Sequence, residues 1–67
     1  TILPSGELLV ADSLTGELLA FTRQADGALT DRRVWAAIPG EMPDGISLDA
    51  EGAVWIASHH QVLRVRE

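Results

Sequence analysis

Hydrophobic residues along the chain come in short runs separated by turn-forming residues, and they do not recur at helical spacing. The runs cover residues 7–11, 17–23, 33–38, 45–49, 53–57 and 62–66. Each is as long as a typical β-strand and too short for a typical helix. Steps such as Asp26-Gly27 and Pro39-Gly40, which favour turns, lie between the runs. The pattern therefore predicts an all-β chain of short, consecutive antiparallel strands.

Particular residues within this pattern carry further expectations. Asp26-Gly27 is a strong hairpin signal, because both central residues of the tightest turns adopt positive φ. Trp35 and Trp55 fall within predicted strands and are expected to be core aromatics packed between sheets. Arg32-Arg33 precedes a strand and is expected to be a solvated or salt-bridged pair.

The strand pattern contains an internal repeat. When Gly6 is placed on Gly52, 46 residues later, the run 8–11 falls on the run 54–57. After the following loop, Leu18 falls on Val62, which is 44 residues later, so the second copy has the shorter loop. A period in the mid-forties with about four strands per unit is typical of a β-propeller blade. The chain thus holds about one and a half blades, an incomplete propeller, with residues 1–38 as most of one blade and residues 43–67 as the first strands of the next.

Composition narrows the class of protein further. Sixty-seven residues allow at most one small domain, and the chain has neither Cys nor Lys. The net charge of −5, without any basic cluster, argues against nucleic acid as a partner. Apolar runs are too short to cross a membrane, so no membrane association is expected. No signal peptide is visible, which favours a cytoplasmic location, although the natural N-terminus need not be Thr1.

The stretch Pro43–Ala57 resembles a signature of the SMP-30/gluconolactonase/LRE-like family. Residues 9–13, the segment around Phe21 and Asp26-Gly27, and residues 31–36 are similar to the preceding blade of that family in order and spacing. The resemblance implies a six-bladed β-propeller with one catalytic divalent metal ion at its central pore. It also implies the hydrolysis of a sugar lactone or a related ester by metal-activated water.

The resemblance gives Asp44 as one of the metal ligands, because it matches the Asp of the family's Pro-Asp-Gly motif. A carboxylate is a suitable ligand for a hard divalent cation, and Gly45 beside it would let the backbone approach closely. The alternative is that Asp44 only caps a Pro-Asp-Gly turn. The remaining family ligands and the proposed general base have no counterpart here, so the catalytic residues stay unknown. A Ca²⁺- or Zn²⁺-type ion is therefore expected only if a complete site forms.

Two loops are expected on the same face as Asp44. Asp12 and Ser13 follow a strand and either line the pore or form an Asx-type turn. His59 and His60 occupy the corresponding loop of the next blade, which is two residues shorter than in the family. Adjacent residues of an extended chain point to opposite sides, so the two histidines cannot chelate one ion. One of them could act as an acid, a base or a substrate contact near pH 7, and the alternative is that both are ordinary loop residues.

These observations leave functions of different classes. The first is part of a metal-dependent hydrolase of a small-molecule lactone or ester, completed by the remainder of a longer propeller chain or by other copies. The second is a catalytically inactive fragment or structural module that self-associates through an unpaired strand edge. A non-enzymatic propeller that binds other proteins is a third.

Overall fold

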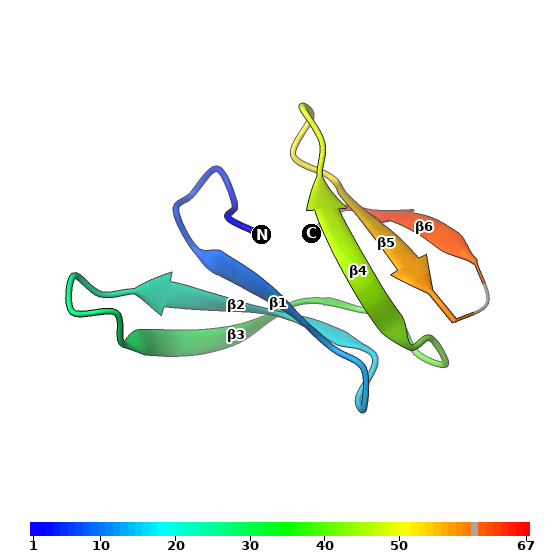
Figure 1. The fold of residues 1–67 in the computed structure, drawn as a ribbon, viewed down its shortest axis with the longest axis horizontal. Helices are drawn as coiled ribbons and strands as arrows, with labels where there is room; N and C mark the ends of the chain where they lie inside the picture. The colour runs from blue at the N-terminus through cyan, green and yellow to red at the C-terminus, as the bar shows by residue number, and fades with distance from the viewer. Residues whose placement is uncertain (60) are drawn as a thin grey trace.

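The protein consists entirely of β-structure in the part of the chain that the computed structural model describes, residues 1–59 and 61–67 (Figure 1). The strands are β1 (Leu8–Asp12), β2 (Glu17–Arg23), β3 (Leu29–Ala37), β4 (Pro43–Leu48), β5 (Val54–Ser58) and β6 (Val62–Val65). The all-β prediction is confirmed. Strand β3 begins four residues earlier than the hydrophobic pattern indicated, because residues 29–32, of which only Leu29 is apolar, extend the pairing with β2. The described residues include no helix of the length and apolar character needed to span a bilayer.

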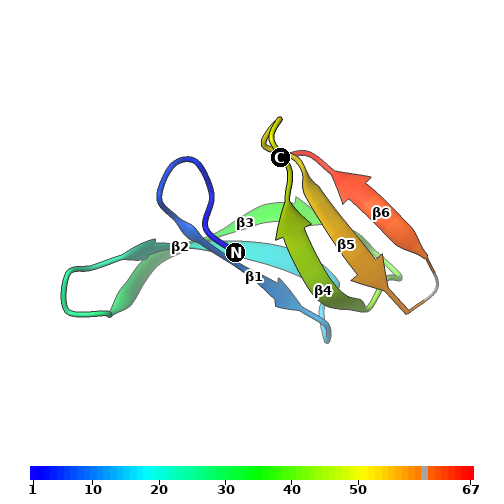
Figure 2. The same ribbon diagram turned by 45° about the horizontal axis from the view of Figure 1, so that its top comes forward.

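The strands form two three-stranded antiparallel sheets in chain order, β1-β2-β3 and β4-β5-β6. Each sheet is a meander in which every strand pairs with the next one along the chain. Figures 1 and 2 show the second sheet lying against one face of the first, with β4 beside β1. This is the arrangement of one incomplete propeller blade followed by another.

The hairpin between β2 and β3 differs in detail from the prediction. Gly27 has a φ of 89° and donates from its N–H to the carbonyl of Gln24 at 3.0 Å. Asp26 does not have positive φ; its carboxylate instead accepts a hydrogen bond from the N–H of Ala28 at 2.9 Å. The Asp side chain stabilises the longer turn by this bond, so only the glycine needs the left-handed conformation.

The hydrophobic core lies between the facing sides of the two sheets. Its buried residues are Leu3, Leu9, Leu18, Ala20, Trp35, Ile38, Val54 and Ile56. Trp35 is buried, as the sequence predicted. Trp55 is not a core residue: it is 45% exposed, and its indole N–H donates to the Asp49 carboxylate at 3.0 Å. The prediction for Trp55 was wrong because its strand buries the residues on either side of it, Val54 and Ile56, against the first sheet.

The internal repeat is visible in the backbone hydrogen bonds. The N–H of Gly6 donates to the carbonyl of Leu3 at 2.8 Å, and 46 residues later Gly52 donates to Asp49 at 3.2 Å. Both glycines have positive φ, 91° and 82°. The bridge between Ile2 and Leu8 likewise has its counterpart in the pairing of residues 48 and 54. The repeat thus extends to residue 2, further towards the N-terminus than the sequence comparison reached.

Equivalent positions of the two repeats bury opposite faces. Leu9 of β1 is buried and Val10 is exposed, whereas their counterparts Trp55 and Ile56 of β5 are exposed and buried, respectively. The pairing register is nevertheless the same, since residues 11 and 18 pair as residues 57 and 62 do. Two consecutive blades that stack front to back must bury opposite sides of equivalent strands, because the front of one blade meets the back of the next.

Candidate functional site

A polar cavity of about 220 Å³ lies where the β1–β2 loop meets the start of β4 and the end of β5. Its lining residues are Ser13, Met42, Pro43, Asp44, Ser58 and His59. The structure therefore brings together three of the residues singled out in the sequence, Ser13, Asp44 and His59, from three different segments. His60, which the sequence analysis grouped with His59, lies outside the described residues.

A β-bulge positions Asp44 at this cavity. In the pairing of β4 with β5, Pro43 lies opposite Ser58 and Gly45 lies opposite Ala57, so Asp44 has no residue opposite it. A bulge bends its strand locally and redirects a side chain, and bulges are frequent next to active sites. The Asp44 carboxylate is exposed and lines the cavity, so it is accessible to a ligand there.

Gly45 leaves open space beside Asp44. A Cβ atom built on Gly45 would meet no atom within 4 Å, and the residue does not have positive φ. No close backbone approach occurs at this position among the described residues.

A tight backbone contact occurs at Gly16. Its carbonyl accepts a hydrogen bond from the N–H of Ile38 at 2.8 Å, which joins the β1–β2 loop to the segment leading into β4. A Cβ at Gly16 would lie 3.0 Å from the carbonyl oxygen of Ile38 and 3.1 Å from that of Glu41, and φ is +71°. Gly16 thus permits the close approach of the β1–β2 loop, which carries Ser13, to the segment leading into β4.

Asp12 is used by its own loop. One of its carboxylate oxygens accepts hydrogen bonds from the N–H groups of Leu14 at 2.9 Å and Thr15 at 3.3 Å. Its carbonyl also accepts a hydrogen bond from the N–H of Gly16 at 3.0 Å. Asp12 does not line the cavity, and its geometry is that of an Asx-type turn, one of the two alternatives given by the sequence.

A hydrogen-bonded group beside the cavity was not predicted. The Ser58 hydroxyl donates to one carboxylate oxygen of Glu41, and the Gln61 side-chain amide donates to the other at 2.6 Å. The N–H of His59 donates to the carbonyl of Met42 at 3.2 Å. These bonds tie the β5–β6 loop to the segment before β4. Nothing in the sequence indicates them, because partners 17 and 20 residues apart meet only after the strands pair.

The donors at the cavity do not by themselves form a metal centre. Within residues 1–59 and 61–67, no three His, Cys, Asp or Glu side chains lie close enough together to hold an ion. The cavity offers one carboxylate, from Asp44, and one imidazole, from His59, together with the Ser13 and Ser58 hydroxyls. A divalent cation such as Ca²⁺ normally takes six to eight oxygen ligands, so further ligands would have to come from outside the described residues.

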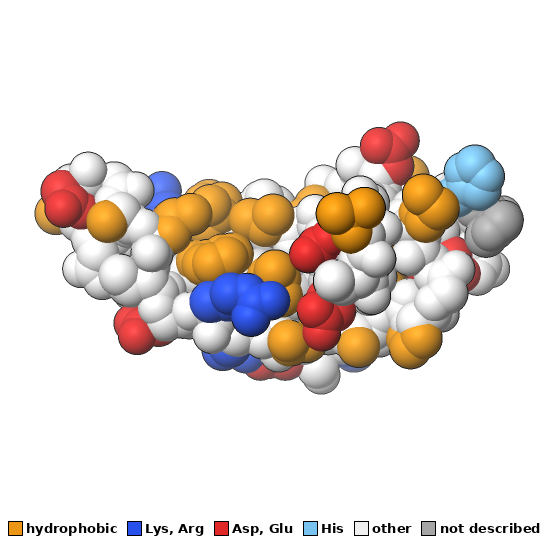
Figure 3. Space-filling model, turned by 90° about the horizontal axis from the view of Figure 1, so that it is seen from below, with side chains coloured by type: hydrophobic (Ala, Val, Ile, Leu, Met, Phe, Trp, Pro, Cys, Tyr) orange, Lys and Arg blue, Asp and Glu red, His pale blue; other side chains and the backbone are white. Residues whose placement is uncertain are grey.

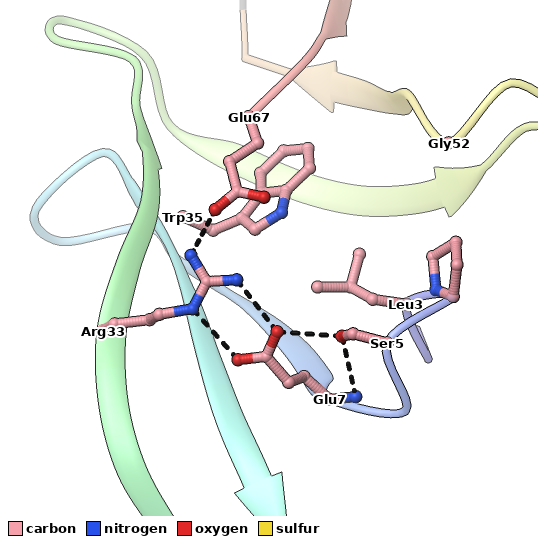
Figure 4. Close-up of a pocket in the computed structure, with 8 residues that line it drawn as sticks. Leu3, Ser5, Glu7, Arg33, Trp35, Gly52 and Glu67 are labelled. Atoms are coloured by element: carbon pink, nitrogen blue, oxygen red, sulfur yellow. Dashed lines mark hydrogen bonds and ion pairs between the residues drawn. The ribbon is translucent and has the colours of Figure 1, made fainter.

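A second cavity, of about 250 Å³, is lined by charged groups that already have partners (Figure 4). Arg33 donates to the two carboxylate oxygens of Glu7 at 3.0 and 2.8 Å and also to Glu67. The hydrogen bonds from Arg33, with one from Ser5, lower the pKa of Glu7 to about 2, and those to Glu7 and Glu67 raise the pKa of Arg33. Figure 4 shows these groups beside Trp35. This network fits a stabilising role, since its charges are paired with one another.

A third polar group surrounds Asp49, at the turn between β4 and β5. Partial desolvation raises the pKa of the Asp49 carboxyl, but the hydrogen bonds that it accepts outweigh this effect, and the pKa lies below its ordinary value. The donors are Arg64, the N–H groups of Glu51 and Ala53, and the Trp55 indole. The Arg64 guanidinium lies 6.0 Å from the centre of the Trp55 ring, within the range of a cation–π contact. Trp55 is therefore held on the outer surface of the sheet.

One comparison with known proteins gives a result. The family model described as SMP-30/Gluconolactonase/LRE-like region matches residues 5–67, which is nearly the whole chain. No curated protein and no solved structure matches this chain.

Proposed function

Because the chain belongs to the SMP-30/gluconolactonase/LRE-like family, we propose that it is part of a lactonase-like β-propeller that hydrolyses a sugar lactone or a similar ester. Family membership supports the class of reaction. The cavity at Asp44 supports its location, since it lies at the end of two stacked sheets and gathers polar side chains from three segments.

The observation that carries the proposal is the bulge at Asp44. If Pro-Asp-Gly only formed a turn, the Asp44 carboxylate would not need to lie at a cavity that is lined by three segments. Here Pro43 and Gly45 both remain in the strand, and only Asp44 is left unopposed. An exposed carboxylate held in this way suits the binding of a cation or of a substrate hydroxyl.

In this proposal Asp44 supplies one oxygen ligand to a divalent ion of the Ca²⁺ or Zn²⁺ type, and other parts of the complete propeller supply the rest. When bound, such an ion polarises an ester carbonyl and activates water. The residues of this chain orient the substrate: the Ser13 and Ser58 hydroxyls and the His59 imidazole line the cavity. Each of these side chains can exchange hydrogen bonds with the hydroxyl groups of a sugar lactone.

Hydrolysis of gluconolactone by the complete propeller, monitored by alkali uptake at constant pH with and without added Ca²⁺ or Zn²⁺, tests the proposal. We expect a metal-dependent rate above background that falls at least about tenfold in Asp44→Asn. Asp31→Asn is the matched control, because Asp31 is an exposed carboxylate outside the cavity whose φ of 52° suits asparagine equally well. No metal-dependent rate, or equal rates in the two variants, would contradict the proposal.

A catalytically inactive interaction module is the second candidate, and the absence of a three-ligand group in residues 1–59 and 61–67 favours it. Such a module would associate with other propeller units and bind no substrate. Calorimetric titration with gluconate, a product of lactone hydrolysis, separates the two candidates. Binding that is lost in Asp44→Asn supports the hydrolase, and a defined assembly without any binding supports the module.

A further inference from the structure

The Ser58 hydroxyl lines the polar cavity, and its proton already has an acceptor outside that cavity. Ser58 is the last residue of β5 and lies opposite Pro43, the residue before Asp44. Its hydroxyl is hydrogen-bonded to the carboxylate of Glu41, which does not line the cavity. An ionised carboxylate accepts hydrogen bonds and donates none, so Ser58 supplies the proton of this bond.

Glu41 is itself held in place by a second donor. Its other carboxylate oxygen accepts a hydrogen bond from the Gln61 side-chain amide at 2.6 Å, so both oxygens act as acceptors. The N–H of Ser58 donates to the carbonyl of Gln61 at 2.8 Å, which closes the set of three residues. The bond between Ser58 and Glu41 is partly buried, and hydrogen bonds to an ionised group are about twice as strong as those between neutral groups. Glu41 therefore holds the Ser58 proton in one direction.

A serine hydroxyl fixed in this way can play only one part in the cavity. It has one proton and two lone pairs, and with the proton held by Glu41 its oxygen can only accept hydrogen bonds from a group in the cavity. The Asp44 carboxylate lines the same cavity and is also an acceptor. Figure 3 is viewed from the end that carries the β1–β2 loop, and acidic side chains are exposed over β4–β6 on its right. This part of the cavity therefore suits ligand groups that donate hydrogen bonds.

The functional groups of a lactone differ in whether Ser58 can bind them. The carbonyl oxygen and the ring oxygen are acceptors only, so both would meet a lone pair of Ser58. A hydroxyl substituent has a proton to donate. Ser58 can thus bind the hydroxyl groups of a substrate, but it cannot donate a hydrogen bond to the ester that reacts.

We propose that Ser58 is a specificity-determining residue that selects hydroxylated lactones, and that Glu41 is the residue that positions it. This inference rests on the proposed lactone hydrolysis and adds the atom of this chain, Ser58 Oγ, that recognises a substrate hydroxyl. The carboxylate of Glu41 acts only through Ser58. Loss of either side chain therefore affects substrates with hydroxyl groups and spares substrates without them.

Rates of the complete propeller on two lactones test the proposal. Gluconolactone is compared with δ-valerolactone, which has the same ring but no hydroxyl groups. Ser58→Ala should lower kcat/KM for gluconolactone about three- to tenfold, as expected for one uncharged hydrogen bond, and leave δ-valerolactone unchanged. Ser58→Thr keeps the hydroxyl and should keep the wild-type ratio of the two rates. Ser47→Ala is the matched control, because Ser47 is an exposed serine of β4 that does not line the polar cavity.

Glu41→Leu tests the positioning role. It should also reduce the preference for gluconolactone, because the Ser58 proton can then turn into the cavity. Ser58→Ala should cost less in the Glu41→Leu background than in the wild type, since the two residues act as a unit. A merely structural role would lower the rates on both lactones equally, and independent roles would give additive losses. Additive losses would overturn the role of Glu41.

The two lactones also separate this inference from the proposed function. Equal losses on both lactones in Ser58→Ala, or a ratio of rates that Ser58→Ala leaves unchanged, would overturn the inference while the hydrolase activity stands. A wild type that prefers δ-valerolactone would overturn it in the same way. A wild type that hydrolyses neither lactone would overturn the proposed function and this inference with it.

Discussion

Glu7 shows how one residue ties distant segments of this chain together. It lies just before β1, yet its carboxylate binds Arg33 of β3, which also binds Glu67 at the end of the chain. Arg33 thereby joins the first sheet to the segment that follows β6 (Figure 4). The sequence predicted that Arg33 is either solvated or salt-bridged but did not indicate its partners, which are 26 and 34 residues away.

The pKa of Glu7 leads to a prediction about acid stability. Because its pKa is near 2 in the folded chain and about 4.5 ordinarily, ionised Glu7 stabilises the fold above about pH 4.5, and this contribution is lost between about pH 4.5 and 2. Glu7→Gln should reduce the loss of stability across this window and lower stability at pH 7. Urea unfolding midpoints of both proteins, measured from pH 6 to 2.5, check this. Parallel pH profiles would contradict it.

Individual side chains also mark the limit of what the sequence alone could predict. Trp35 and Trp55 both lie in strands with similar local patterns, and only the stacking of the sheets decides which one is buried. Asp12 and Asp44 both sit beside turns, and only the register of β4 with β5 directs Asp44 to the cavity. In each pair, the outcome depends on contacts between residues far apart in the chain.

At the scale of elements, the positions of strands were predictable and the irregularities between them were not. Alternating apolar positions and turn residues located all six strands to within a few residues, because both signals are local. The bulge at Asp44 arises because β4 has one more residue than β5 between two successive paired positions. No local sequence pattern indicates this difference. The contact at Gly16 likewise requires a loop to meet a segment more than twenty residues further along the chain.

The position of Gly16 predicts a specific sensitivity of the candidate site. Gly16→Ala must accommodate both positive φ and a Cβ that lies 3.0 Å from a carbonyl oxygen, so we expect a loss of about 2–3 kcal/mol in stability. Gly27→Ala is the matched control: its φ of +89° is similar, but its Cβ meets no atom, and a loss of about 1–2 kcal/mol is expected. Denaturant unfolding measures both. Equal losses would mean that the β1–β2 loop does not press against the segment before β4.

At the scale of the whole molecule, two stacked sheets explain both the family resemblance and the incomplete site. One sheet covers one face of the other, which leaves Val34 on one outer face and Trp55 and Val62 on the other partly exposed. Among the described residues, Asp44 is the single acidic residue that lines the polar cavity. A closed ring of blades would cover these faces and bring further side chains around the same end. Architecture and candidate chemistry therefore both require more than one pair of sheets.

The most direct test of the cavity as the functional site is a heteronuclear NMR titration of the complete propeller with Ca²⁺ and, separately, with Zn²⁺. We expect the largest saturable shifts at the amides of Ser13, Asp44 and His59, and we expect them to disappear in Asp44→Asn but not in Asp31→Asn. Shifts confined to the acidic residues around Arg33 and Arg64, or no saturable shifts at all, would contradict the assignment of this cavity.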